Sequence, residues 1–200
     1  MHPLLTKLGV SGEIQDFFGI SELNFHYGSS VSAEFFEEGF HYVPAADQAW
    51  IWNTNAGSHV VLTDSVMEAI AFLSCNRHRY PRLHNLAFVA LGRLPGWLQL
   101  AEINARFPQR HFILVFANDL LGRLTDVYVA AALRNHVPRL FWRGDKVEII
   151  SRGRALQFEA NDITLNVFQK AFGIRTCCRT IKPKRHASFL ILLLQQPPQP

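Results

Sequence analysis

Short runs of apolar residues recur in the middle of the chain, at 86–91, at 112–116 and at 60–62, where the β-branched Thr63 completes a predicted strand at 60–63. Between and after them, at 66–73, 97–107 and 123–135, apolar residues recur at helical spacing. A strand that is buried on both faces is apolar throughout, which is typical of a parallel sheet with helices on either side. The pattern therefore predicts an α/β core with a sheet of about four mainly parallel strands, in which residues 139–142 supply the fourth strand.

Shorter elements flank this core. Before it, a short helix is predicted at 13–18, and aromatic-rich strands at 23–27, 35–43 and 49–52 suggest an antiparallel meander. After it, we expect a hairpin at 146–151 and 155–160, and a helix at 163–172 that Asp162 caps and Gly173 ends. Strands are predicted at 175–181 and 188–194. We therefore divide the chain into a β-rich extension (1–57), an α/β core (58–143), a basic α+β subdomain (144–194) and a Pro/Gln-rich tail (195–200) that is expected to be disordered.

The composition narrows the class of protein. The chain has 200 residues, of which 48% are hydrophobic and 18% charged, so it can bury a substantial core. Its longest apolar run, 189–194, is much shorter than the roughly 18 residues of a membrane span, and residues 1–12 lack the features of a secretory signal. The three cysteines include an adjacent pair and no C-x-x-C, which argues against a disulfide framework or a zinc site. We expect a cytoplasmic protein without a membrane partner.

Positive charge is concentrated in one segment. Residues 139–185 contain eleven basic and four acidic residues, a net charge of +7, whereas the whole chain carries +4 and the remainder is therefore −3. Such asymmetry favours a surface that binds a polyanion, although a solvated basic surface is the alternative. The candidate nucleic-acid ligands are Arg152, Arg154, Lys170, Arg179, Lys182, Lys184 and Arg185, together with Arg123 from the core. Phe141 and Trp142 either stack on bases or pack in the core.

Acidic residues follow the first and third predicted strands of the core. Asp64 follows the strand at 60–63, and Asp119 follows the strand at 112–116. Carboxylates on neighbouring loops at this edge of a parallel sheet can share Mg²⁺. Ser65 and Glu68 have the spacing of a capping box, which explains Glu68 without a metal. Asp119 also suits a turn before a helix, and Arg123 is either a phosphate ligand or a surface residue of the first helical turn.

Residues 61–73 followed by 114–123 resemble a Toprim domain, the fold shared by bacterial primases, topoisomerases and some nucleases. The resemblance is to the Toprim modules of mobile-element primase-like proteins in particular. It implies that Asp64 replaces a catalytic glutamate, one methylene shorter, and that Ala117 and Asp119 replace the two aspartates of a metal-binding D-x-D. The positions that match the family context are Asn118, Gly122 and Arg123. Because Ala117 supplies no ligand, the resemblance implies a degenerate site in which Asp64 and Asp119 bind Mg²⁺ weakly or not at all.

These observations leave competing functions. The first is a nucleic-acid-binding protein with a degenerate Toprim-like domain, which binds DNA or RNA. The resemblance links it to mobile-element replication or mobilisation, with a relaxase or primase as the protein partner. The second is a Mg²⁺-dependent nuclease or primase-type phosphotransferase, in which Asp64 is the catalytic group. The third is an interaction module, in which the aromatic N-terminal strands bind a protein.

Overall fold

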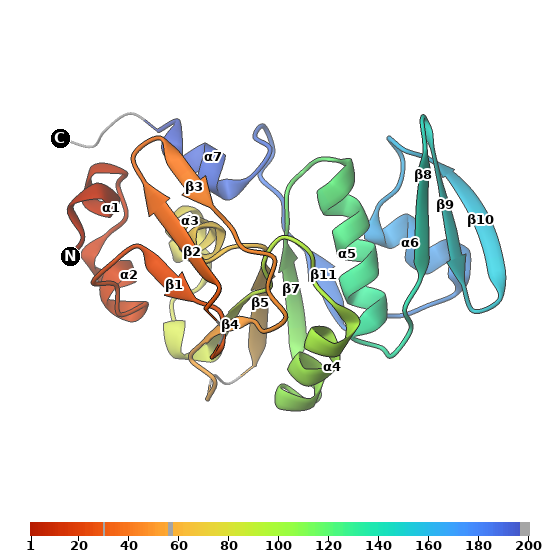
Figure 1. Cartoon of the computed structure of the whole chain (residues 1–200), viewed down its shortest axis with the longest axis horizontal. Helices are drawn as coiled ribbons and strands as arrows, with labels where there is room; N and C mark the ends of the chain where they lie inside the picture. Colours follow the sequence, from red (N-terminus) through yellow and green to blue (C-terminus); the bar gives the residue numbers. More distant parts are fainter. Residues whose placement is uncertain (30, 56–57, 197–200) are drawn as a thin grey trace.

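A mixed α/β fold is built around a mostly parallel sheet in the computed structural model, which describes residues 1–29, 31–55 and 58–196. The strand order is β11 (Cys178–Thr180), β7 (His111–Val115), β5 (His59–Thr63), β6 (Leu86–Ala90) and β4 (Trp50–Trp52) (Figure 1). The first four are parallel, and β4 runs antiparallel to β6. The predicted α/β sheet is thus confirmed, including the pairing of β5 with β7.

Helices cover both faces of this sheet, because its strands carry apolar side chains on both sides. On one face, Val61 and Ile113 belong to the core formed with α3 (Val66–Asn76) and α7 (Phe189–Leu194). On the other face, Leu62 and Leu114 belong to the core formed with α4 (Trp97–Arg106) and α5 (Leu120–Ala132). Single 3₁₀ turns at Arg77–Arg79 and Leu83–Asn85 connect α3 to β6.

The N-terminal part contains α1 (Pro3–Lys7), α2 (Gly12–Phe17) and an antiparallel sheet in the order β1 (Asn24–His26), β2 (Ala33–Glu37), β3 (Phe40–Tyr42). The predicted meander is therefore present, but the strand at 49–52 was wrongly placed in it. That strand is β4, which extends the central sheet and pairs with β6. Its Trp50 and Trp52 rings stack 6.1 Å apart and contact the apolar core of that face, which fixes β4 at the sheet edge.

The C-terminal part forms a separate antiparallel sheet in the order β10 (Arg154–Glu159), β9 (Lys146–Ser151), β8 (Arg139–Arg143), with α6 (Leu165–Phe172) packed on one face. The prediction that residues 139–142 form the fourth parallel strand is therefore wrong. A tight turn at Gly144, with φ of 69°, pairs β8 with β9 locally, and β11 takes the place beside β7. Thr164, rather than Asp162, caps α6, whereas Gly173 ends it as predicted, with φ of 66°.

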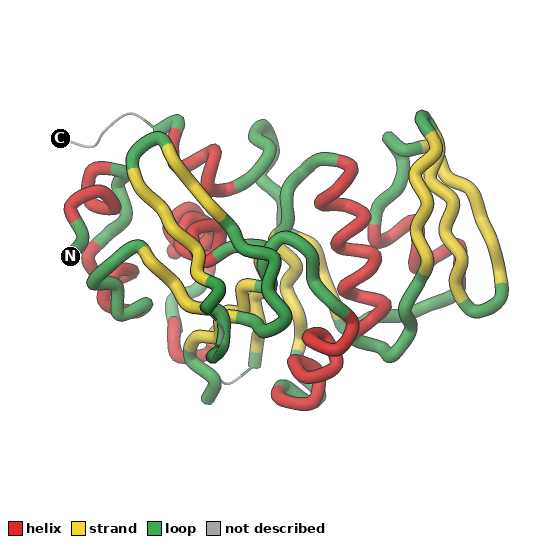
Figure 2. The backbone as a smooth tube through the Cα atoms, viewed as in Figure 1, coloured by secondary structure: helices red, strands yellow, loops and turns green. Residues whose placement is uncertain are grey.

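Residues 188–194 were predicted to form a strand, but residues 189–194 form helix α7 (Figure 2). The Ser188 hydroxyl accepts a hydrogen bond from the Ile191 N–H and caps the helix. Phe189, Leu190 and Leu193 are buried at helical spacing, and they pack against α3. Of the predicted tail, residues 197–200 lie outside the described residues. Among the described helices, none has both the length and the apolar composition to cross a bilayer.

Candidate functional site

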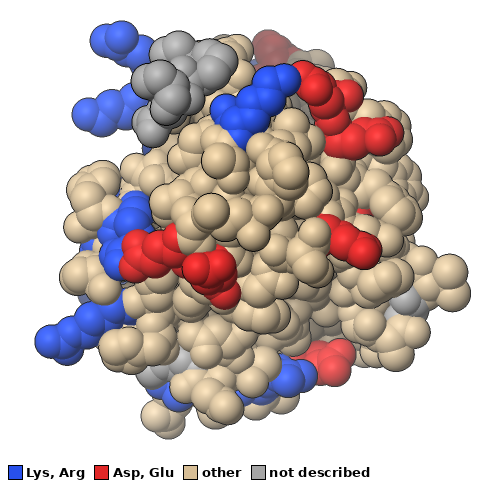
Figure 3. All heavy atoms as spheres, turned by 90° about the vertical axis from the view of Figure 1, so that its left-hand side faces the viewer, with Lys and Arg blue, Asp and Glu red and all other residues tan. Residues whose placement is uncertain are grey.

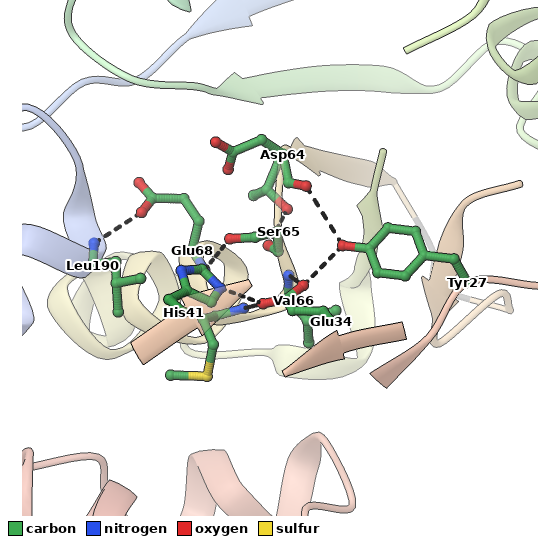
Figure 4. Close-up of polar contacts among 10 residues, drawn as sticks. Tyr27, Glu34, His41, Asp64, Ser65, Val66, Glu68 and Leu190 are labelled. Atoms are coloured by element: carbon green, nitrogen blue, oxygen red, sulfur yellow. Dashed lines mark hydrogen bonds and ion pairs between the residues drawn. The ribbon is translucent and has the colours of Figure 1, made fainter. Parts of the chain in front are cut away.

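The N-terminal end of α3 brings together carboxylates from distant parts of the chain. Glu34 comes from β2, Asp64 follows β5, and Glu68 lies in the first turn of α3. Figure 4 shows Glu34 against Val66, and Asp64 and Glu68 pointing toward the same side. Glu34 and Glu68 are buried, with 0% and 3% of their surface exposed. Negative charge is favoured at this place because the positive end of the helix dipole faces it.

Glu34 is fully engaged in hydrogen bonds. Its carboxylate accepts from the backbone N–H groups of Val66 at 2.6 Å and Met67 at 2.9 Å. It also accepts from the Tyr27 hydroxyl at 2.8 Å and lies 3.0 Å from His41 Nε2. Burial, followed by the negative charge of Glu34, raises the pKa of the Tyr27 phenol far above its ordinary value. Glu34 therefore joins the N-terminal sheet to the first turn of α3.

Sequence reasoning did not find Glu34. Glu34 lies two residues before Phe36, so both side chains occupy the same face of β2, and both are buried. An acidic residue on the apolar face of a strand was the available signal. The role of this carboxylate depends on α3, because its partner Val66 lies 32 residues further along the chain.

Glu68 connects α3 to α7. The Ser65 hydroxyl accepts from the Glu68 N–H at 3.0 Å, as the capping box predicts. The capping box also predicts that the Glu68 carboxylate accepts from the backbone N–H of Ser65. That part is wrong, because the carboxylate instead accepts from the N–H groups of Phe189 at 2.7 Å and Leu190 at 2.8 Å. Burial, and then the charge of Asp64, raises the pKa of Glu68 to about 7. The carboxylate thus caps the N-terminus of α7 and fixes the loop that precedes it.

Asp64 is the less engaged member of this group. Burial, and then the negative charge of Glu34, raises the pKa of its carboxyl to about 6. Its backbone carbonyl accepts from the Gly92 N–H at 3.0 Å, which connects the ends of β5 and β6. Within the described residues, no set of three or more His, Cys, Asp or Glu side chains is arranged to hold a metal ion.

Asp119 caps α5. β5 and β7 are neighbours, with Thr63 opposite Val115, so Asp64 and Asp119 follow adjacent strand ends. The Asp119 side chain is exposed, and its Oδ1 accepts from the Gly122 N–H at 2.7 Å. Gly122 is required here, because a Cβ at this position would collide with the backbone of Ala117.

Arg123 and Asn118 form hydrogen bonds to neighbouring segments of the chain. The Arg123 guanidinium donates to the carbonyls of Ala160 at 3.1 Å and Asn161 at 3.3 Å, where β10 has ended. The Asn118 side chain donates to the Pro183 carbonyl at 3.3 Å, and its backbone N–H donates to the Ala187 carbonyl at 2.6 Å. Both residues therefore connect the core to C-terminal segments.

Lys182 places its ammonium at the carboxyl end of β7. Nζ donates to the carbonyls of Phe116 at 2.9 Å and Ala117 at 3.1 Å, and forms an ion pair with Asp126 Oδ2 at 2.7 Å. Asp126 is buried, and burial raises its pKa to about 7 against the opposing effect of Lys182. The Lys182 ammonium is thus engaged by partners within the fold, and 17% of its side chain is exposed.

A groove with a volume of about 470 Å³ lies between the end of α3, α7 and the loop that joins β11 to α7. Its apolar wall includes Phe189 and Leu192 of α7. The basic and histidine side chains that line it are Arg79, Lys182, Lys184, Arg185 and His186, and none of its described lining residues is acidic. We call this feature the basic groove.

The other predicted nucleic-acid ligands are dispersed. Arg152 contacts His136 Nε2 at 2.6 Å beside the β9–β10 turn, and the Arg154 guanidinium lies 5.7 Å from the centre of the Phe172 ring. Lys170 is exposed in the last turn of α6, and Arg179 of β11 lies 3.4 Å from the Tyr80 hydroxyl. Of the predicted ligands, Lys182, Lys184 and Arg185 line the basic groove, and the others lie on other elements and turns.

The end of the molecule that the N-terminal elements form carries both basic and acidic side chains (Figure 3). Figure 3 shows the face formed by the N-terminal elements, where most Lys and Arg side chains lie toward the left and top of the view, Asp and Glu side chains lie toward the centre and right, and wide uncharged areas separate them. No protein-family model, curated protein or solved structure significantly matches this chain.

Proposed function

We propose that this protein binds nucleic acid through the basic groove, without catalysing a reaction on it. The observation that carries the proposal is the composition of that groove, whose described lining includes several cationic side chains and no carboxylate. Cations that contact phosphates release counterions and give affinity that does not depend on base sequence. Lys184 and Arg185 are both exposed, so they are the expected phosphate ligands.

The loop that carries these ligands is anchored on either side. Lys182 is fixed by Asp126 and by the end of β7, and Asn118 donates to the carbonyls before and after the basic residues, at Pro183 and Ala187. Glu68 holds the N-terminus of α7. A loop fixed in this way loses less conformational freedom on binding, which favours affinity.

We further propose that the core is a degenerate Toprim-like domain that has lost its catalytic metal. The adjacency of β5 and β7 supports this, because it places Asp64 and Asp119 after neighbouring strands. Asp119 already accepts a hydrogen bond from Gly122, and Glu68 accepts two from α7. The Lys182 ammonium also supplies positive charge beside the backbone of Ala117. A further cation at this end of β7 is electrostatically disfavoured.

The binding proposal is tested by fluorescence anisotropy with a labelled duplex at several salt concentrations. The Lys184→Ala/Arg185→Ala variant leaves Lys182 in place and is expected to bind at least about tenfold more weakly, with a log–log salt slope that is flatter by about 1.8 units. The matched control is Arg82→Ala/Arg93→Ala, which removes the same charge from exposed positions outside the groove.

The control is expected to bind within about twofold of the parent at the same salt concentration. Equal weakening by both double variants would mean that only net charge matters, and would overturn the assignment to the basic groove. Failure of the parent to bind duplex or single-stranded DNA or RNA at low salt would overturn the proposed function itself.

A further inference from the structure

The C-terminal sheet leaves one of its faces uncovered. In β9, Val147, Ile149 and Ser151 are buried, and Val147 and Ile149 belong to the core that α6 completes. Residues of the opposite parity therefore lie on the outer face. Figure 1 shows α6 between α5 and this sheet, so the outer face is turned away from the rest of the described chain.

The register of the sheet places an aromatic ring between arginines on this outer face. Arg139, Phe141 and Arg143 of β8 lie opposite Ile150, Glu148 and Lys146 of β9, respectively. Phe141 is 38% exposed, although aromatic residues in apolar runs are usually buried. Glu148 forms a long ion pair with Arg143 at 3.7 Å, and Glu159 of β10 lies opposite Lys146 without a described ion pair between them. Arg139 is opposite Ile150 and has no carboxylate across from it.

A second exposed ring lies at the tip of the β8–β9 hairpin, but Trp142 is opposite Val147 and so belongs to the α6 side of the sheet rather than to the outer face. Trp142 is 68% exposed, and its indole N–H donates to the Gly144 carbonyl, which holds the side chain at the turn. Exposure of a large aromatic side chain to water is unfavourable, so a ligand that covers the ring gains free energy of burial. On the outer face itself, the Phe141 ring beside Arg139 and Lys146 matches a ligand that has both flat apolar rings and negative charges.

We propose that the outer face of β8 binds single-stranded nucleic acid, with an unpaired base stacked on Phe141 and phosphates held by Arg139 and Lys146. This deepens the proposed function, on which it rests, by assigning single strands to a surface separate from the basic groove. Base–aromatic stacking tolerates any base but requires that the base be unpaired. Duplex DNA has no unpaired base to offer, so it depends on phosphate contacts alone.

Anisotropy with a labelled oligothymidylate and with a duplex of equal length tests this inference. Phe141→Ala is expected to weaken oligothymidylate binding about tenfold, the effect of losing one base stack, and to leave duplex affinity within about twofold. Phe141→Trp is expected to restore single-strand binding. The control is Phe35→Ala, which removes a similarly exposed ring, at 45%, from the N-terminal sheet and is expected to change neither affinity.

The outcomes separate this inference from the proposed function. If Phe141→Ala binds oligothymidylate as the parent does, or loses affinity for both ligands equally, the stacking site is overturned. The basic groove still stands in either case if Lys184→Ala/Arg185→Ala weakens duplex binding. If the parent binds neither ligand, both proposals fail. Circular dichroism of each variant shows whether lost affinity comes from unfolding, and Phe141→Trp keeps the test decisive if Phe141→Ala is unfolded.

Discussion

Glu34→Gln is expected to lower the free energy of unfolding by about 3 kcal/mol. The amide keeps one acceptor oxygen and places an NH₂ donor where the other carboxylate oxygen was. If that oxygen is Oε2, the change affects the bonds from Val66 N–H at 2.6 Å and from the Tyr27 hydroxyl at 2.8 Å. The hydroxyl can turn to accept from the new amide, but the backbone N–H cannot. Losing a charge-assisted bond costs about 1.5–3 kcal/mol, and an unpaired buried donor costs about 1–3 kcal/mol.

Urea denaturation followed by circular dichroism measures this difference. With an m-value of about 3 kcal/mol per M, the midpoint is expected to fall by about 1 M. The control is Glu37→Gln, an exposed carboxylate on the same strand, which is expected to change stability by less than about 0.5 kcal/mol. A Glu34→Gln variant within about 1 kcal/mol of the parent would refute the conclusion that this carboxylate holds the start of α3.

Two further predictions concern the buried charges, and a third concerns the metal. Since burial raises the pKa of Glu68 to about 7 and of Asp64 to about 6, the folded chain binds these protons more tightly. The stability that these two carboxyl groups contribute is complete below their unfolded pKa values near 4, and it is lost as the pH rises to about 7. Thermal melts from pH 5 to 8 should therefore show a Tm that falls with pH. The fall in Tm is expected to be smaller in Glu68→Gln. Lys182→Met leaves Asp126 buried without its partner and is expected to cost about 3–5 kcal/mol in urea denaturation, whereas Lys184→Met is expected to cost less than about 0.5 kcal/mol; equal costs would contradict the internal role of Lys182. Replacing Mg²⁺ by EDTA is expected to leave nucleic-acid affinity unchanged in anisotropy measurements, and a loss of binding would support a metal-dependent site instead.

The central sheet could be predicted because burial on both faces leaves a direct mark on the sequence. Residues 60–62, 86–91 and 112–116 are apolar without interruption, and each run corresponds to a strand of that sheet. The run at 189–194 has the same appearance, yet it forms a helix, because six apolar residues do not distinguish a buried strand from a short helix. Which strand joins which sheet depends on distant pairing, so the memberships of β4 and β8 were not predictable from local patterns.

In the candidate site too, contacts between residues close in sequence could be predicted, and contacts between distant residues could not. Ser65 was correctly assigned as a cap, because its partner Glu68 is three residues away and the pattern is local. Glu34 is 32 residues from its partner Val66, and Lys182 is 66 residues from its partner Phe116. No local pattern therefore indicates that these two charged side chains form hydrogen bonds within the fold. Charge counts predict that a segment is basic, but only the fold separates a partly buried, ion-paired lysine such as Lys182 from an exposed one such as Lys184.

Photocrosslinking tests the central claim most directly, because it locates the nucleic acid on the parent protein. The protein is irradiated with a photoreactive duplex at low salt, and the cross-linked peptides are identified by mass spectrometry. The proposed function predicts cross-links in the peptides that contain residues 181–189 and Arg79, which line the basic groove. Cross-links confined to the N-terminal elements, or none with any nucleic acid, would contradict it.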